Sequence, residues 1–130
     1  MQYYFISYRV DGLDEGIYYI NEEFEELYLI GSAPTHVMLE KMLQFDDTDN
    51  IVGVIVICSD FTLSLQKYAQ QAIKLAFLDA GHAMQNFYLS AQKLGLKFVS
   101  LGGIDEQEFS KLLEIKNEYE KPIYAGVIGV

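Results

Sequence analysis

The sequence predicts one α+β domain in which a mostly antiparallel sheet packs on a long central helix. The first sign is a set of short runs rich in Tyr, Phe, Ile and Val, the residues that fit the half-buried surface of a strand. The second is a long segment, residues 70–94, in which apolar residues recur at helical spacing. The third is the order of the expected elements, which is neither a strict β-α-β repeat nor all strand.

Bulk composition limits what this chain can be. With 130 residues, 51% of them hydrophobic, it can build one core, so residues 1–130 are expected to form a single domain. A formal net charge of −10 argues against nucleic acid and anionic membrane surfaces as partners. No run approaches the ~18 apolar residues of a membrane span, and Met1 leads into a strand-like stretch, not a secretory signal. Cys58 lies in an apolar run, where a buried thiol is ordinary, and we expect a cytoplasmic protein.

Strands are expected wherever β-favouring runs are bounded by turn residues. The segment Asp11–Gly16 is dense in turn formers and predicts a hairpin between the first two strands. The fourth strand is apolar on both faces apart from Gly53, which is typical of a buried strand. The expected strands are residues 3–10, 17–20, 26–30, 51–58, 97–101 and 123–128.

Two short helices are expected from their end signals. The first runs to about Phe45 and has Pro34 in its first turn, with Ser32 or Ala33 just before it, because proline is accepted at that position. The second covers residues 105–115, and the side chain of Asp105 is placed to cap it.

An acidic loop, residues 46–50, follows the first helix. Its three aspartates are spaced like cation ligands, but the glycine and the distal glutamate of a calcium-binding loop are missing. A solvated turn is therefore favoured, and no metal site is expected.

The long segment at residues 70–94 carries the most information. At ~1.5 Å per residue it forms a helix of roughly 35 Å, and Gly95 ends it. One apolar stripe runs along it at alternating spacings of three and four residues: Ile73, Phe77, Ala80, Met84, Phe87, Ala91 and Leu94. The other faces are nearly as apolar, so a small domain is not expected to cover them all. We therefore expect a partner subunit along this helix, in a homodimer or a heterodimer.

The order and spacing of several short motifs resemble the nitroreductase-type flavoproteins, and more narrowly the azoline dehydrogenases of streptolysin-type (SagB-type) and thiazole/oxazole peptide pathways. The resemblance covers nearly the whole chain, about Tyr3 to Gly129, with each motif weak alone. The motifs are residues 10–18 (VDGLDEGIY), 78–86 (LDAGHAMQN), 94–96 (LGL) and 102–105 (GGID).

The resemblance implies an FMN-dependent oxidation of azoline rings in a ribosomally made peptide to azoles. Lys67 and Tyr68 occupy the position of the branch's Lys-Tyr pair, which makes Lys67 the candidate base and Tyr68 its orienting partner. Leu101, Gly102 and Gly103 fit the turn where the family's backbone amides approach the flavin ring, which favours small residues, often at positive φ.

Each of these residues also has an ordinary structural explanation. A solvated lysine and a packed tyrosine at a helix start would look the same as the Lys67-Tyr68 pair. The Gly102-Gly103 pair would also suit a plain strand-to-helix turn. His82, in mid-helix among apolar residues, is expected to be a packed histidine. Asp79, Gln85 and Asn86 are expected to satisfy buried polar groups.

The chain departs from the resembled family in its phosphate contacts. The family's Arg-Ser-x-x-Arg and Ser-Ala-Gly-Gly segments would precede this chain, so we expect the N-terminal half of the usual domain to be missing. Gln71 stands where an arginine is frequent. FMN is therefore expected only if a partner completes the site. The alternatives are a flavin-free scaffold subunit in a peptide-modification complex, or a truncated product without a role.

Overall fold

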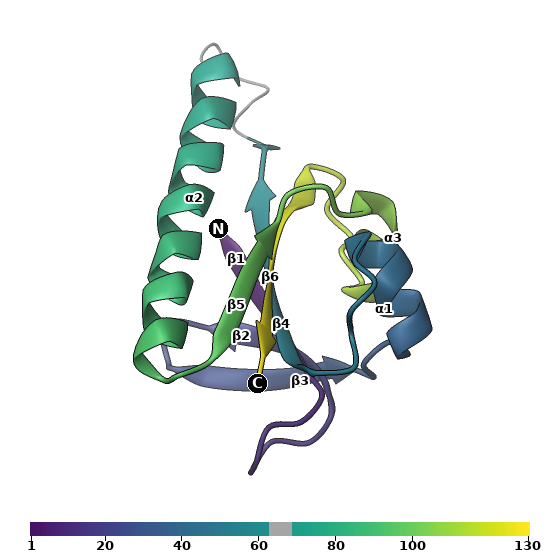
Figure 1. The fold of residues 1–130 in the computed structure, drawn as a ribbon. Coiled ribbons are helices and arrows are strands. Elements are labelled where there is room, and N and C mark those ends of the chain that lie inside the picture. Colours follow the sequence, from purple (N-terminus) through teal and green to yellow (C-terminus); the bar gives the residue numbers. More distant parts are fainter. Residues whose placement is uncertain (63–68) are drawn as a thin grey trace.

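The computed structural model describes residues 1–62 and 69–130. Its six strands form one antiparallel sheet in the order β3-β2-β1-β4-β6-β5, with α2 on one face and α1 and α3 on the other (Figure 1). The elements are β1 Gln2–Ser7, β2 Gly16–Asn21, β3 Glu26–Gly31, α1 His36–Leu43, β4 Ile51–Asp60, α2 Ala69–Lys93, β5 Lys97–Leu101, α3 Glu106–Leu112 and β6 Glu120–Gly129. The predicted α+β class and element order are confirmed.

Strand β4 is apolar throughout because both of its faces are covered. Successive side chains of a strand point to opposite faces. Accordingly, Val54 and Val56 lie in the cluster under α1 and α3, whereas Ile55 and Ile57 lie in the cluster under α2. Cys58 is fully buried on the α1 side, and burial raises the pKa of its thiol, so the thiolate is disfavoured.

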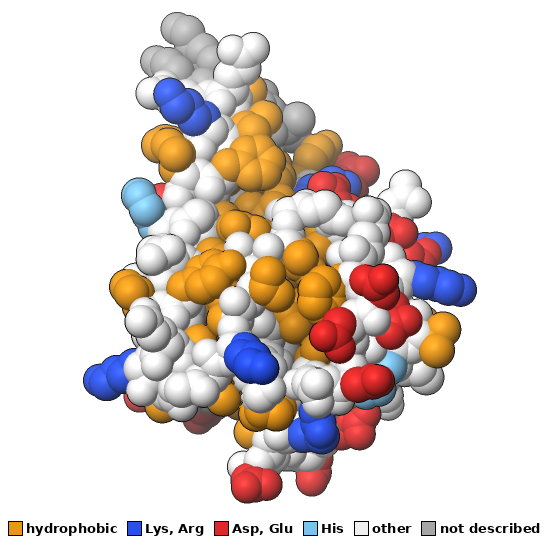
Figure 2. All heavy atoms as spheres, viewed as in Figure 1, with side chains coloured by type: hydrophobic (Ala, Val, Ile, Leu, Met, Phe, Trp, Pro, Cys, Tyr) orange, Lys and Arg blue, Asp and Glu red, His pale blue; other side chains and the backbone are white. Residues whose placement is uncertain are grey.

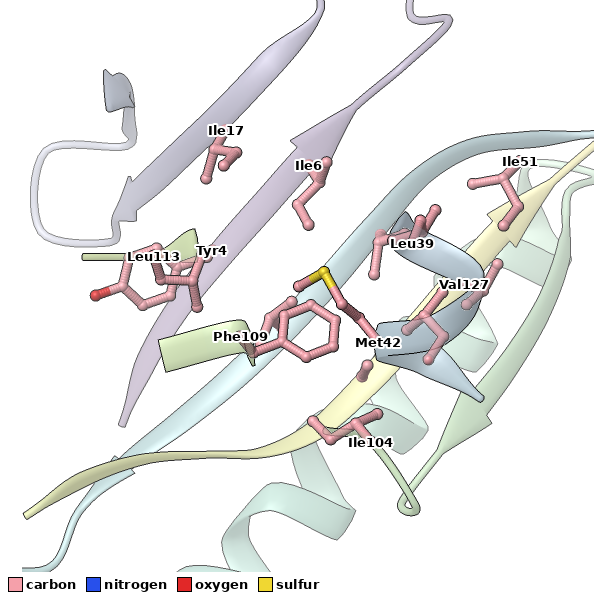
Figure 3. Close-up of a cluster of buried hydrophobic side chains, with 14 of the residues drawn as sticks. Tyr4, Ile6, Ile17, Leu39, Met42, Ile51, Ile104, Phe109, Leu113 and Val127 are labelled. Carbon is pink, nitrogen blue, oxygen red and sulfur yellow. The ribbon is translucent and has the colours of Figure 1, made fainter. Parts of the chain in front are cut away.

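The larger core lies between the sheet and the two short helices (Figure 3). Phe109 of α3 and Leu39 of α1 are completely buried there, and Met42 of α1 lies beside them. Ile6 from β1 and Val127 from β6 supply the sheet side of the cluster. Burying side chains of this size contributes about 1.5–3 kcal/mol each, so this cluster holds α1 and α3 on the sheet.

The second core is narrower and holds α2. Only Ala80, Met84 and Ala91 of this helix are buried, and the cluster that contains Ala80 and Met84 includes the β4 residues Ile55 and Ile57. The backbone of β6 also comes close at this point. A Cβ added at Gly126 would lie 2.4 Å from Cζ of Phe98 and 2.9 Å from Sδ of Met84. A glycine at position 126 thus lets these two side chains fill the space over β6.

The first helix begins later than predicted. Pro34 is buried ahead of the helix, where its carbonyl oxygen accepts a hydrogen bond from the Tyr8 hydroxyl at 2.8 Å. Thr35 is the N-cap instead, and its side chain accepts from the amide of Met38 at 3.3 Å. The first strand also ends at Ser7, three residues before its predicted end, where the chain turns into the loop.

The end of α2 and the start of α3 lie where the sequence places them, whereas α3 ends at Leu112, three residues before its predicted end. Gly95 has a φ of +71°, and the Leu96 amide donates to the Ala91 carbonyl at 2.9 Å, which closes the last turn of α2. The side chain of Asp105 accepts from the Glu108 amide at 3.1 Å and caps α3.

We expect Gly126→Ala to lower the free energy of unfolding by about 1–3 kcal/mol, because the added methyl must displace Phe98 or Met84. The matched control is Gly81→Ala on α2, where an added Cβ meets nothing within 4 Å and φ is not positive. That change should raise stability by about 0.5–1 kcal/mol through helix propensity. Urea denaturation measures both, and equal stability of the two variants would contradict the packing argument.

Candidate functional site

The turn after β5 holds three of the predicted cofactor-binding residues. Leu101 is half-buried against the larger core, whereas Gly102 and Gly103 are exposed. A Cβ on either glycine would meet nothing within 4 Å. Neither glycine has a positive φ, so that part of the prediction is wrong, because this turn leads into α3 through ordinary backbone conformations. The chain's own contacts therefore do not require glycine here.

In the described residues, this turn and the C-terminal end of β4 lie at the same end of the sheet. β4 and β5 both pair antiparallel with β6, so they run in the same direction. Leu101 pairs with Ala125 and Asp60 with Glu120, which is a five-residue offset along β6, or roughly 17 Å. The predicted catalytic pair, Lys67 and Tyr68, lies outside the described residues.

A hydrogen-bonded cluster supports β5 one residue before the turn. The Ser100 amide donates to the Tyr88 hydroxyl at 2.9 Å, and the hydroxyls of Tyr88 and Tyr124 lie 3.1 Å and 3.0 Å from Oγ of Ser100. Tyr88 also packs edge-on against Phe98, with ring centroids 4.6 Å apart. Sequence reasoning missed this cluster, because its members come from α2, β5 and β6. It fixes the strand that leads into the Gly102-Gly103 turn.

A second polar group lies where β4 ends and β6 begins. The pKa of Glu120 is raised, first by burial and second by the neighbouring carboxylate of Asp60. Hydrogen bonds from the side chain and amide of Thr62 lower the pKa of Asp60 and keep it ionised. The Oε1 atom of Glu120 is buried, and no described residue donates to it. Burial raises the pKa of Tyr4 as well, and Glu120 adds to that shift.

The polar residues of α2 face away from the sheet. His82 was expected to be packed, but it is exposed, as are Asp79, Gln85 and Asn86. Those predictions are wrong for this chain because Ala80 and Met84 occupy the side of the helix that meets the sheet, which turns the four polar side chains outward.

Helix α2 also exposes much of its apolar surface, which Figure 2 shows along the helix and over the adjoining strands. The helix extends past the end of the sheet (Figure 1). In the first part of the predicted stripe, Ile73 and Phe77 are exposed, and Phe77 packs against Phe61 with ring centroids 6.1 Å apart. A second group of apolar residues lies about 160–220° around the helix from Ala80. The exposed residues, which we call the outer α2 surface, are Ile73, Leu75, Phe77, Leu78 and Leu89.

Comparison with known proteins identifies the family of this chain. The nitroreductase family model matches residues 3–130, and the chain belongs to that family. A Methanocaldococcus jannaschii protein named as a nitroreductase is 28% identical over 121 residues, which is 92% of this chain and 60% of the relative. The chain thus spans less than two thirds of that relative's length.

Three solved structures share the fold. A protein of Anabaena variabilis named as a nitroreductase has a TM-score of 0.88 and 26% identity, covering 98% of this chain and 26% of that one. The E. coli microcin synthetase McbBCD complex, with truncated pro-MccB17 bound, has a TM-score of 0.80 and 18% identity, over 99% of this chain and 51% of that one. A protein of Ralstonia eutropha named as a nitroreductase has a TM-score of 0.77 and 21% identity, over 98% and 56%.

The described residues offer few groups that could hold a metal or a phosphate. Nowhere in residues 1–62 and 69–130 do three His, Cys, Asp or Glu side chains meet as metal ligands would. The chain has nine Lys and Arg residues against nineteen Asp and Glu. In the same ranges, no helix is both long enough and apolar enough to cross a membrane.

We expect Glu120→Gln to stabilise the protein more at pH 7 than at pH 4. A carboxyl whose pKa is raised on folding binds its proton more tightly in the folded state, so its contribution to stability falls as pH rises above its ordinary pKa of 4.5. Glutamine removes that loss. Thermal unfolding of both proteins at pH 4 and pH 7 measures the difference. An exposed control, Glu106→Gln, should show a much smaller pH effect, and a similar effect in both variants would contradict the assignment.

Proposed function

We propose that this chain is one part of an FMN-dependent oxidoreductase that becomes competent when a second polypeptide covers the outer α2 surface. The observation that carries the proposal is the exposure of this helix. Phe77, Leu78 and Leu89 are each at least half exposed on the longest helix of the domain. Exposed apolar residues gathered on one helix mark a surface that another protein covers, and polar residues such as His82 and Gln85 lie among them here.

Gly81 supports a close-fitting partner at the same helix. It lies in the middle of α2, where glycine costs about 1 kcal/mol relative to alanine. Nothing in the described part of the chain lies within 4 Å of a Cβ at this position, so no described contact compensates that cost. A second backbone that approaches α2 here would account for it, because a side chain would hold that backbone away.

The Gly102-Gly103 turn fits the edge of a flavin ring. Among the described residues, neither amide donates to an acceptor, and the space over both Cα atoms is open. Both amides are therefore available to hydrogen-bond a flat, polar ring edge, with Leu101 anchoring the turn in the core. FMN, when bound, supplies the hydride acceptor.

The phosphate of FMN fits this chain poorly. A net charge of −10 gives no local excess of lysine and arginine to neutralise it. In the proposal, the second polypeptide supplies those cations.

Lys67 is the proposed base, and Tyr68 is proposed to orient it. Removal of a proton from carbon at neutral pH needs a base whose pKa lies near the working pH. A lysine that is desolvated loses proton affinity and moves toward that range. The support for this pair is its sequence position, directly before Ala69, the first residue of α2.

The proposed substrate is a thiazoline or oxazoline ring in a ribosomally made peptide. The motif resemblance supports this class, and so does the fold similarity to a microcin synthetase complex that holds a truncated pro-peptide. Within such an assembly, this chain would act beside other subunits.

A flavin-free scaffold subunit is the second candidate. The charge balance, nineteen acids against nine bases, favours it, because a scaffold has no phosphate to bind. The two candidates share the outer α2 surface and differ in whether bound flavin is present.

Co-expression with the products of neighbouring open reading frames tests the assembly. We expect a stable complex that absorbs visible light as bound flavin does. Gly81→Ala should raise the melting temperature of the isolated chain but reduce recovery of the complex about tenfold, because the methyl separates the two surfaces. Gln92→Ala, exposed near the end of the same helix, serves as the matched control and should assemble normally. Colourless complexes would favour the scaffold, and normal assembly of Gly81→Ala would contradict the interface.

Replacement of the proposed base tests the chemistry separately. The complex that carries Lys67→Ala should keep its flavin but oxidise azoline peptides about 10²–10⁴ times more slowly, because a general base usually contributes a rate factor of that size. Lys74→Ala, an exposed lysine of α2, should retain the full rate. Product formation is followed by mass spectrometry as the loss of two hydrogens per ring. An unchanged rate in Lys67→Ala would remove this residue from the mechanism.

A further inference from the structure

Strand β3 is an open edge of the sheet. Among the described strands it pairs only with β2, and all six of its residues, Glu26–Gly31, are exposed. The opposite edge, β5, is partly closed, because the Tyr88 hydroxyl accepts the outward amide of Ser100. In the described part of the chain, no side chain closes the backbone of β3 in this way. Proteins usually protect such an edge with charged residues, whereas β3 exposes Leu27 and Leu29.

A hollow of about 350 Å³ lies directly beside this edge, and we call it the tyrosine hollow. Its wall contains two alternate residues of β3, Tyr28 and Ile30, which point to the same face of the sheet. Tyr4 and Tyr19 stand behind them, with ring centroids 5.6 Å apart in an edge-on arrangement. The full lining is Tyr4, Tyr19, Tyr28, Ile30, Leu113 and Glu114, and Figure 3 shows Tyr4 and Leu113 together at one end of the core.

The tyrosine hollow is negatively charged. Glu114 lines it, and Glu26 accepts a hydrogen bond from the Tyr28 hydroxyl. The hydrogen bond to Glu26 raises the pKa of Tyr28, and burial, with Glu120 close by, raises the pKa of Tyr4. The phenols therefore stay neutral, and the charge comes from the carboxylates alone. No lysine or arginine is among the lining residues.

Aromatic faces and carboxylates together select a cation. A lysine ammonium or an arginine guanidinium over a tyrosine face gains about 0.5–2 kcal/mol, more when water is excluded. The turn before β3 adds Glu22, Glu23 and Glu25, all near the same strand end and all negative. The surface as a whole is thus complementary to a positively charged chain.

We propose that β3 and the tyrosine hollow bind an extended, positively charged segment of the substrate peptide. The main chain of that segment adds to the sheet along β3, and a lysine or arginine side chain enters the hollow between the phenol rings. Main-chain pairing supplies affinity in this mode of recognition, and the side-chain pocket supplies specificity. Only the naming of the segment as substrate rests on the proposed function.

A peptide fits this surface better than a folded subunit does. The six residues of β3 match one short strand, and the tyrosine hollow of about 350 Å³ lies directly next to it. The surface is also separate from the outer α2 surface, because Tyr28 and Ile30 line a hollow with residues of the α1 and α3 core. A subunit bound along α2 therefore leaves β3 free.

Calorimetric titration of the full chain with three acetylated heptapeptides tests the proposal. Each alternates threonine and valine, with lysine, norleucine or glutamate at its centre. We expect the lysine peptide to bind at least tenfold more tightly than the norleucine peptide, and the glutamate peptide not to bind. Equal binding of the three would overturn the proposal. The titration needs no flavin and no turnover, so its result is independent of whether FMN binds.

Two further measurements locate the site. Glu114→Gln should weaken lysine-peptide binding about fivefold or more, whereas Asp46→Asn, an exposed acid in the loop after α1, should bind as the unaltered chain does. In the unaltered chain, amide hydrogen exchange along Glu26–Gly31 should slow when the lysine peptide binds, while exchange in β5 should not change. Binding without protection of β3, or with equal effects of the two substitutions, would overturn the proposal.

Discussion

The requirement that β4 be covered on both faces determines how this domain is built. Its alternating side chains enter two separate clusters, Val54 and Val56 on one side and Ile55 and Ile57 on the other. The short helices α1 and α3 share the first side, and α2 alone covers the second. Because α2 is longer than the sheet that it covers, its N-terminal part extends beyond the strands (Figure 1) and its apolar residues stay exposed. The exposed surface that we propose as a partner site thus follows from the packing of one strand.

The two unsatisfied surfaces of the chain differ in chemistry. The outer α2 surface consists of aliphatic and aromatic side chains, with polar residues such as Asp79 and His82 exposed on the same helix, and it suits a protein interface. The β3 edge combines unpaired backbone groups with tyrosines and carboxylates, which suits a single extended chain. Acidic side chains gather on the α1 and α3 side of the molecule, away from α2 (Figure 2). The two proposed sites, for a subunit on α2 and for a peptide at β3, therefore lie on different elements.

Local signals in the sequence predicted the fold because they act within a few residues. A run of apolar residues predicted β4, a left-handed glycine ended α2 at Gly95, and an aspartate cap began α3. Where a distant residue decided the outcome, prediction failed: the Tyr8 hydroxyl holds the Pro34 carbonyl and moves the start of α1 to Thr35. The Tyr88-Ser100-Tyr124 cluster and the tyrosine hollow were likewise invisible, since their members meet only through the sheet. The candidate base could be named only from motif spacing.

Five glycines of the chain fall into two groups, and the difference between the groups bears on function. Packing inside the domain explains why positions 53 and 126 are glycine. A Cβ at either Gly53 or Gly126 would lie 2.4 Å from a phenylalanine ring carbon. No packing among the described residues explains Gly81, Gly102 and Gly103: their surroundings are open and their φ angles are not positive. Glycine at such positions gives up conformational entropy without a compensating contact in the described chain. Gly81 marks the outer side of α2, and Gly102 and Gly103 mark the turn after β5. The same physical argument therefore supports the proposed partner backbone at Gly81 and the proposed flat ligand at Gly102 and Gly103.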